Sequence, residues 1–128
     1  MNELQQQACL EISKKLLDLK LLKGSVQEVV EKKLYQAYYP HGIGHYLGMD
    51  VHDVGLYKFK DKPRKLEAGM VITVEPGIYI PINDISVPKE MRRIGVRIED
   101  NIHVTSSEPE ILTAALKKEV SDLELSQG

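Results

Sequence analysis

The chain has 128 residues, of which 42% are apolar, and this size and composition predict a single domain with a modest hydrophobic core. Its formal charge of -2 gives no general attraction for nucleic acid, and no apolar run is long enough to span a membrane, so neither partner is expected. The one cysteine, Cys9, excludes an internal disulfide and is typical of a reducing, intracellular compartment; its expected role is that of a small apolar residue on a helix.

Two helices are predicted at the start of the chain. Apolar residues recur at helical spacing from residue 2 to about residue 22, and Gly24 is expected to end this first helix. The stretch Ser25-Val-Gln-Glu28 has the form of a capping box, and it predicts a second helix that runs to about Ala37. Both helices are interpreted as packing elements that cover one face of a sheet.

The densest group of potential metal ligands is the stretch from His41 to Asp53, which holds three of the four histidines of the chain. Imidazole nitrogens bind divalent metals and act as acids or bases near neutral pH, so we expect a metal centre here. The interleaved glycines and Pro40 predict extended or irregular backbone, and no glutamate follows His41, so the helical zinc-peptidase motif is absent. The alternative is a polar loop whose histidines only form hydrogen bonds.

A basic run at residues 58–65 is interpreted as a solvated loop. Beyond it, residues 69–80 are rich in β-branched side chains and predict a strand that is interrupted at Pro76-Gly77. Glu75 lies at this interruption, at the end of an apolar strand. A carboxylate in such a place is costly unless it is paired or binds a metal, so Glu75 is expected to have a partner. Exposure to solvent at the strand end is the alternative.

A second strand, from residue 94 to residue 105, alternates between apolar and polar side chains and is expected to pair with the first strand as an antiparallel hairpin. This pairing predicts Glu75 and Glu99 on the same face. Arg97 is expected to orient a carboxylate there by a charge-assisted hydrogen bond, and the alternative is an ordinary cross-strand ion pair with Glu99. The remaining predicted elements are a short strand and a final short helix, at Ile111-Leu112 and around Val120.

The stretch from His41 to Asp53 resembles the signature of the proline peptidases, the group that contains aminopeptidase P and prolidase. Two further blocks, Gly69-Met-Val-Ile-Thr-Val-Glu-Pro-Gly-Ile-Tyr79 and Gly95-Val-Arg-Ile-Glu-Asp100, resemble blocks of the same family, in its order and near its spacing. The detail is most similar to aminopeptidase P. The resemblance implies an α+β, pita-bread fold, present in part, in which a curved antiparallel sheet is backed by helices.

The resemblance also implies a centre of two divalent metal ions, commonly manganese. In that family scheme His45 and Glu75 would bind one ion, and Glu99 would bridge both. His41 and His52 would line the substrate site, with His52 near the scissile carbonyl. Glu75 would also carry the proton that passes to the leaving nitrogen.

Arg97 would steady the carboxylates without binding a metal itself. The family takes its other two ligands from aspartates on earlier strands, and no such strands are expected here. Residues 1–128 are therefore interpreted as a single domain, the C-terminal part of a catalytic domain whose N-terminal half and separate N-terminal domain are absent. An open sheet edge of this kind favours self-association or pairing with the missing half.

The function implied by the resemblance is that of a metalloaminopeptidase, which removes the amino-terminal residue of a peptide with proline at its second position. A cytoplasmic or mitochondrial location would accord with the family. Two alternatives stay open. The first is a catalytically incomplete module of the same fold that binds peptides or assists assembly, and the second is prolidase.

Overall fold

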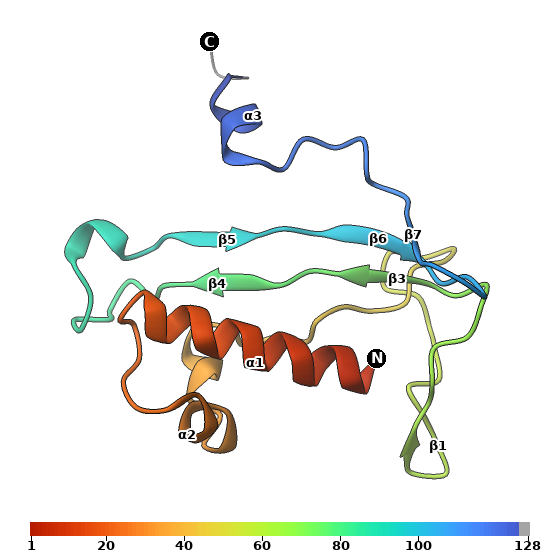
Figure 1. Ribbon diagram of the computed structural model, residues 1–128, viewed down its shortest axis with the longest axis horizontal. Helices are drawn as coiled ribbons and strands as arrows, with labels where there is room; N and C mark the ends of the chain where they lie inside the picture. The colour runs from red at the N-terminus through yellow and green to blue at the C-terminus, as the bar shows by residue number, and fades with distance from the viewer. Residues whose placement is uncertain (126–128) are drawn as a thin grey trace.

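The computed structural model describes residues 1–125 and shows antiparallel strands with helices packed on one side (Figure 1). Helices α1 (Asn2–Asp18) and α2 (Val26–Glu31) lie on that side, and α3 (Val120–Leu125) lies on the other. Two short 3-10 turns are η1 (Leu34–Ala37) and η2 (Lys89–Met91). Within residues 1–125, no helix is both long and apolar enough to cross a membrane. The predicted α+β class, with antiparallel strands backed by helices, is confirmed.

The central strands form one long, twisted hairpin. Its four strands are β3 (Val71–Val74), β4 (Gly77–Tyr79), β5 (Gly95–Arg97) and β6 (Asp100–His103). β3 pairs with β6 and β4 pairs with β5, both antiparallel, so the predicted hairpin is confirmed. The first arm is interrupted at Glu75-Pro76, one residue before the predicted Pro76-Gly77, because Gly77 already pairs with Arg97. The second arm is interrupted opposite it at Ile98-Glu99. The two glutamates therefore lie at the same level of the hairpin.

Helix α1 is shorter than the sequence predicts. It ends at Asp18, and Lys20 then adopts a left-handed backbone conformation with a φ of 59°. The amides of Leu21 and Leu22 turn back to donate to the carbonyl of Leu16. This turn buries Leu21, which is 7% exposed. The apolar pattern continues past the helix because these residues reach the core from a turn, so the predicted end near residue 22 is wrong.

Helix α2 begins as predicted and ends early. The Ser25 hydroxyl accepts a hydrogen bond from the Glu28 amide at 3.1 Å, which caps the first turn. The helix stops at Glu31, because Lys33 is left-handed with a φ of 54°, a conformation that no right-handed helix continues through. A separate 3-10 turn follows to Ala37, so the prediction of one continuous helix is wrong.

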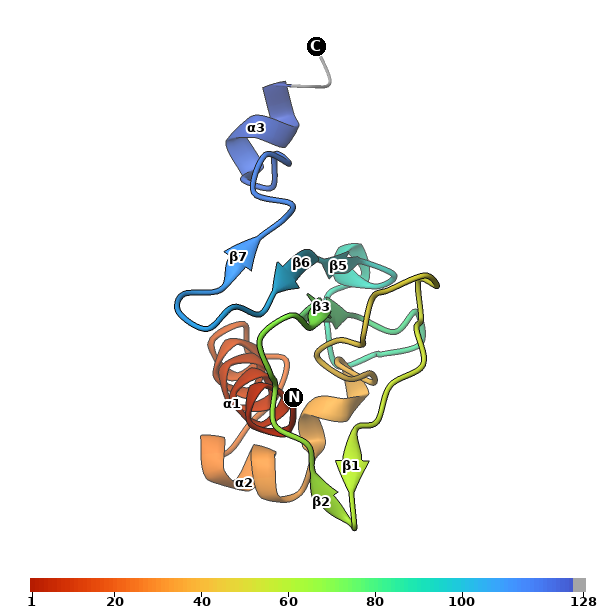
Figure 2. The same ribbon diagram turned by 90° about the vertical axis from the view of Figure 1, so that its right-hand side faces the viewer.

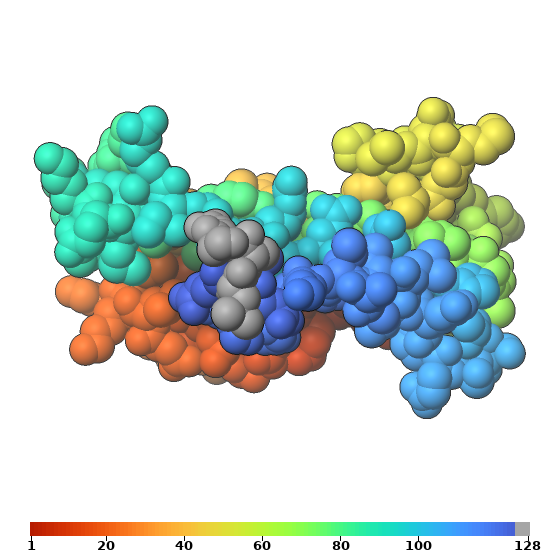
Figure 3. Space-filling view, turned by 90° about the horizontal axis from the view of Figure 1, so that it is seen from above, coloured from red at the N-terminus to blue at the C-terminus, as the bar shows by residue number. Residues whose placement is uncertain are grey.

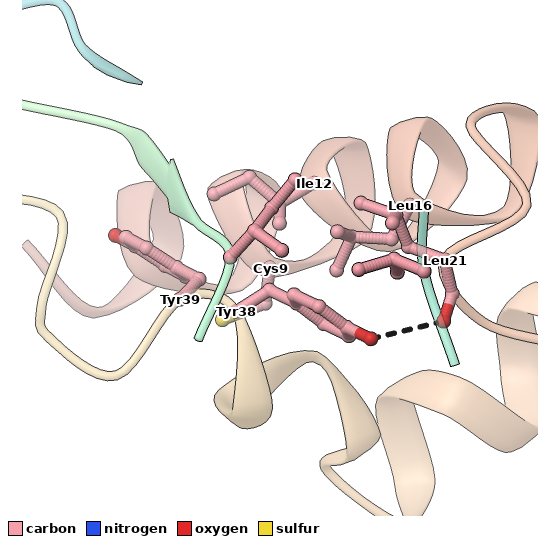
Figure 4. Close-up of a cluster of buried hydrophobic side chains, with 8 residues drawn as sticks. Cys9, Ile12, Leu16, Leu21, Tyr38 and Tyr39 are labelled. Atoms are coloured by element: carbon pink, nitrogen blue, oxygen red, sulfur yellow. Dashed lines mark hydrogen bonds between the residues drawn. The ribbon is translucent and has the colours of Figure 1, made fainter. Parts of the chain in front are cut away.

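The main buried cluster lies between α1 and the strands (Figure 4). Its members are Cys9, Ile12, Leu16, Leu21, Tyr38, Tyr39, Ile80 and Val87. Cys9 is 5% exposed on α1, which confirms its expected role as a small apolar residue. The two tyrosines directly precede Pro40 and His41, so the core anchors the histidine stretch at its start.

Tyr38 and Tyr39 are both buried, but only one of them has its hydroxyl satisfied. The Tyr38 hydroxyl donates to Asp84 Oδ2 at 2.6 Å and lies 3.2 Å from the Leu21 carbonyl oxygen. Among residues 1–125, the Tyr39 hydroxyl is buried without a hydrogen-bond partner. Burial raises the pKa of Tyr39 to about 12.

The Tyr39→Phe substitution is expected to increase the free energy of unfolding by about 1 kcal/mol, because it removes an unpaired buried hydroxyl and keeps the ring. The matched Tyr38→Phe substitution is expected to decrease it by about 1–2 kcal/mol, because it leaves the Asp84 carboxylate without that donor. Urea denaturation of both variants measures the difference. A Tyr39→Phe variant less stable than the Tyr38→Phe variant would contradict this assignment.

The basic run at residues 58–65 is largely exposed, as expected, but it forms an ordered hairpin of β1 (Lys58–Phe59) and β2 (Lys62–Pro63). Lys60 and Asp61 have φ angles of 49° and 63°. Two successive positive φ values are typical of the tight turn that joins antiparallel strands. Figure 2 shows this hairpin projecting away from the main strands.

The C-terminal segment adds β7 (Glu110–Ile111), which pairs with β6, and then α3. Both predicted elements are present. The segment between them returns to the start of β6, where the Lys118 ammonium and the Thr113 hydroxyl each donate to Asp100. These two donors hold the pKa of the Asp100 carboxyl below its usual range.

Candidate metal centre

Residues 43–47 run alongside β3 as an extended segment. The Thr73 amide donates to the His45 carbonyl at 2.9 Å, and the Glu75 amide donates to the Ile43 carbonyl at 2.7 Å. The predicted absence of a helix is confirmed. This pairing sets the register between the histidine stretch and the strand, and so places His45 beside Glu75.

Gly44 and Thr73 make this close approach possible. A side-chain carbon on Gly44 would lie 1.9 Å from the Thr73 carbonyl oxygen, so only glycine fits there. The Thr73 hydroxyl accepts a hydrogen bond from the His45 amide at 3.0 Å and donates to Glu75 Oε1 at 2.9 Å. Thr73 therefore links the backbone of one candidate ligand to the carboxylate of another.

His45, Glu75 and Glu99 converge from three separate segments. Each offers one ligand atom, and these atoms all lie within 4.8 Å of one another. His45 Nδ1 lies 2.9 Å from the Tyr46 carbonyl oxygen, which can only accept, so Nδ1 carries a hydrogen and Nε2 is the ring nitrogen left to face the two carboxylates. Nε2 faces Glu75 Oε1 at 3.3 Å. A ring nitrogen and a carboxylate oxygen at this distance are joined either by a proton on Nε2 or by a cation between them.

The negative charge of the buried Glu75 carboxylate is stabilised by partners on two sides. Glu75 is 9% exposed, and a carboxylate buried to this degree needs partners. The Thr73 hydroxyl bonds Oε1, while Arg97 Nη1 lies 3.9 Å from Oε2. Arg97 was expected to orient a carboxylate by a hydrogen bond, but 3.9 Å is too long for one, so its contribution is electrostatic. Arg97 forms its ion pair with Glu75. The alternative prediction, an ion pair between Arg97 and Glu99, is therefore wrong.

His41 and His52 lie outside this group of three. His41 Nδ1 lies 2.8 Å from the Gly42 carbonyl oxygen and therefore donates to it, and Nε2 shares a hydrogen bond of 2.9 Å with the Tyr79 hydroxyl. The His52 ring contacts the His45 ring edge to face, with centroids 4.5 Å apart. His52 belongs to the exposed loop near residue 50, one of two lobes at opposite ends of the molecule in Figure 3 (yellow).

Sequence reasoning missed Thr73 and Tyr79 as parts of this site. Thr73 lies two residues before Glu75 on the same strand face, which was a usable signal. Tyr79 reaches His41 through long-range pairing, and its ring centroid lies 5.4 Å from that of His41. No local pattern indicates such a contact.

Comparisons with known proteins show which family the chain resembles. The model of Metallopeptidase family M24 matches residues 2–106. The Xaa-Pro aminopeptidase of Haemophilus influenzae is 56% identical over 109 residues, which are 85% of this chain and 25% of that protein. Xaa-Pro aminopeptidase 3 of Homo sapiens is 49% identical over 115 residues, which are 88% of this chain and 22% of that protein. The chain thus spans about a quarter of the length of these relatives.

Solved structures show the same relationship. Pseudomonas aeruginosa aminopeptidase PepP superposes with a TM-score of 0.93 at 46% identity, and the match covers 98% of this chain and 28% of that one. Escherichia coli aminopeptidase P with the inhibitor Pro-Leu gives a TM-score of 0.85 at 42% identity, covering 94% and 27%. The predicted pita-bread fold, present in part, is confirmed by these similarities. With a family match over most of its length and strands that superpose on aminopeptidase P, the chain belongs to Metallopeptidase family M24.

Proposed function

We propose that this chain carries part of the active site of a metalloaminopeptidase that removes an amino-terminal residue preceding proline. The observation that carries the proposal is that His45 Nε2 faces Glu75 Oε1 at 3.3 Å, with Glu99 beside them. The relatives named Xaa-Pro aminopeptidase supply the reaction class.

The residues present suit a divalent cation. An imidazole nitrogen and two carboxylates are a donor set suited to first-row divalent metals. His45, Glu75 and Glu99 would hold the metal, and a pair of such ions supplies a hydroxide nucleophile and stabilises the oxyanion. We take manganese as the first ion to test. A second ion needs more ligands than these three, and we propose that they come from sequence outside this quarter-length segment or from a second copy.

The side chains around the cluster have separate roles in this proposal. Glu75 Oε1 is held by Thr73 and Oε2 faces Arg97, so the carboxylate is oriented to take up a proton and to release it to the leaving proline nitrogen. His52 lies beside His45, where it can donate to the substrate carbonyl. His41, fixed by the Tyr79 hydroxyl, would contact the substrate.

Two experiments test this proposal, first a measurement of metal content and then an assay of peptide cleavage. Protein of confirmed intact mass is purified with Mn2+, and its metal content is measured by mass spectrometry. We expect bound manganese in the wild-type chain and its loss in His45→Ala. The control is His103→Ala, since His103 lies on β6 outside the cluster. Equal metal content in both variants would contradict the site.

The cleavage arm uses an Xaa-Pro-Xaa tripeptide and an Xaa-Pro dipeptide. Release of the first residue from the tripeptide, by the chain or by the assembly that completes it, is the expected result. Cleavage of the dipeptide alone would instead identify a prolidase. If the assembly binds the peptide saturably but does not cleave it, the chain belongs to a catalytically incomplete module that binds peptides.

A further inference from the structure

The residue after Glu99 is tied to the C-terminal segment. Successive side chains of extended backbone point to opposite faces, so Glu99 and Asp100 are directed oppositely. Glu99 lies in the cluster with His45, whereas Asp100 accepts hydrogen bonds from Thr113 and Lys118. We call Asp100, Thr113 and Lys118 the tail latch.

The tail latch is a connected set of short contacts. Lys118 Nζ and Thr113 Oγ1 each lie 2.5 Å from Asp100 Oδ1. The Thr113 hydroxyl also accepts from the Asn101 amide at 3.1 Å, and the Leu112 amide donates to the Asn101 carbonyl at 2.8 Å. The latch therefore fixes the side chain of Asp100 and the backbone of Asn101, the first two residues of β6.

Glu99 depends on this fixation because its own backbone lies in the interruption of the hairpin. The ladder stops at Arg97, paired with Gly77, and resumes at Asp100, paired with Val74. Within the interruption, the Ile98 amide donates to the Pro76 carbonyl at 3.2 Å. Asp100 is thus the first paired residue after Glu99, and its position sets the direction of the Glu99 side chain.

We propose that the tail latch positions Glu99 for metal binding, an inference that rests on the proposed function of the cluster. Lys118 and Thr113 are positioning residues, since they act through Asp100 and touch neither His45 nor Glu75. The segment from Leu112 to Lys118 is accordingly part of the metal centre's support, although it follows the three sequence blocks of the site.

The test compares two side-chain contacts between β6 and the segment that follows it, Lys118 with Asp100 and His103 with Glu110. Lys118→Met removes the latch donor, and Lys118→Arg restores a cationic donor. His103→Gln is the matched control, because His103 Nδ1 pairs with Glu110 Oε2 at 3.1 Å at the far end of β6. For each full chain we measure Mn2+ affinity by calorimetry, the melting temperature, and amide exchange at Ile98 in metal-free protein.

Lys118→Met is expected to weaken Mn2+ binding by about tenfold, in the range seen when a support of a metal ligand is lost. Lys118→Arg should bind within about threefold of wild type, since one hydrogen-bond donor replaces another. The control should match wild-type affinity. Equal affinity in wild type and Lys118→Met, or equal weakening in Lys118→Met and the control, would overturn the inference.

Amide exchange separates this inference from the proposed function. If the wild-type chain binds no Mn2+, the proposed centre fails, and the positioning claim is decided on metal-free protein. Faster exchange of the Ile98 amide in Lys118→Met, but not in the control, would support it, and unchanged exchange would overturn it. Should Lys118→Met fail to fold by circular dichroism, Thr113→Val provides the same comparison with a substitution of similar shape.

Discussion

Replacing Glu99 by glutamine is expected to abolish measurable Mn2+ binding. The substitution keeps the size and polarity of the side chain but removes its negative charge. One charge pair at about 4 Å contributes about 4 kcal/mol at the effective dielectric constant of a protein surface, which corresponds to about 1000-fold in affinity. Calorimetric titration of the chain with Mn2+ measures the loss. In an assembly that cleaves Xaa-Pro peptides, activity should fall with metal content.

The matched control is Glu108→Gln, which makes the same charge change at an exposed position in the turn between β6 and β7. It should leave the Mn2+ dissociation constant within about twofold of wild type, because surface charges at a distance are screened. Circular dichroism of both variants checks that the fold is intact. A Glu99→Gln chain that bound Mn2+ as tightly as the control would remove Glu99 from the proposed centre.

The convergence of Glu75 and Glu99 could be predicted because its causes are local. Residues 69–80 are β-branched with one interruption, and residues 94–105 alternate between apolar and polar side chains. Two such strands joined by one connection pair most simply as a hairpin. That pairing alone places the two carboxylates at the same level, and the structure has them there.

The parts that could not be predicted depend on contacts between distant residues. The ends of α1 and α2 are set by left-handed turns at Lys20 and Lys33. Packing in the core favours these turns, although the local sequence pattern predicts that each helix continues. Residues 43–47 pair along β3, although Gly44 among them disfavours a strand in isolation. The bonds from Tyr79 to His41 and from Lys118 to Asp100 span 38 and 18 positions, respectively.

The roles of the site residues differ in how far the geometry supports them. His45, Glu75 and Glu99 share one cluster, so their assignment as ligands has a physical basis in the convergence of one imidazole nitrogen and two carboxylates. The placement of His52 and His41 against a substrate stays a prediction, as do the number and identity of the metal ions and the compartment. Each follows from the family resemblance.

Gly44→Ala is expected to destabilise the fold strongly. Among the glycines of the histidine stretch, Gly44 is the one where an added methyl group would meet backbone atoms. The new carbon would lie 1.9 Å from the Thr73 carbonyl oxygen, so residues 43–47 must move away from β3. The hydrogen bonds from Thr73 to His45 and from Glu75 to Ile43 flank this point and would lengthen together. We expect a decrease of about 3 kcal/mol in the free energy of unfolding, the upper end for overpacking in a rigid environment.

Gly42→Ala is the control, two residues earlier in the same stretch. A carbon added there would meet only Gln5 Oε1 at 3.7 Å, an ordinary contact, and Gly42 has no positive φ. Restricting the unfolded chain should make this variant about 0.5 kcal/mol more stable than wild type. Urea denaturation measures the free energy of unfolding of both variants, which is expected to fall in Gly44→Ala and to rise in Gly42→Ala. Mn2+ titration of the two variants shows whether stability and metal binding fall together. If Gly44→Ala were as stable as Gly42→Ala, the close pairing that brings His45 to Glu75 would be wrong.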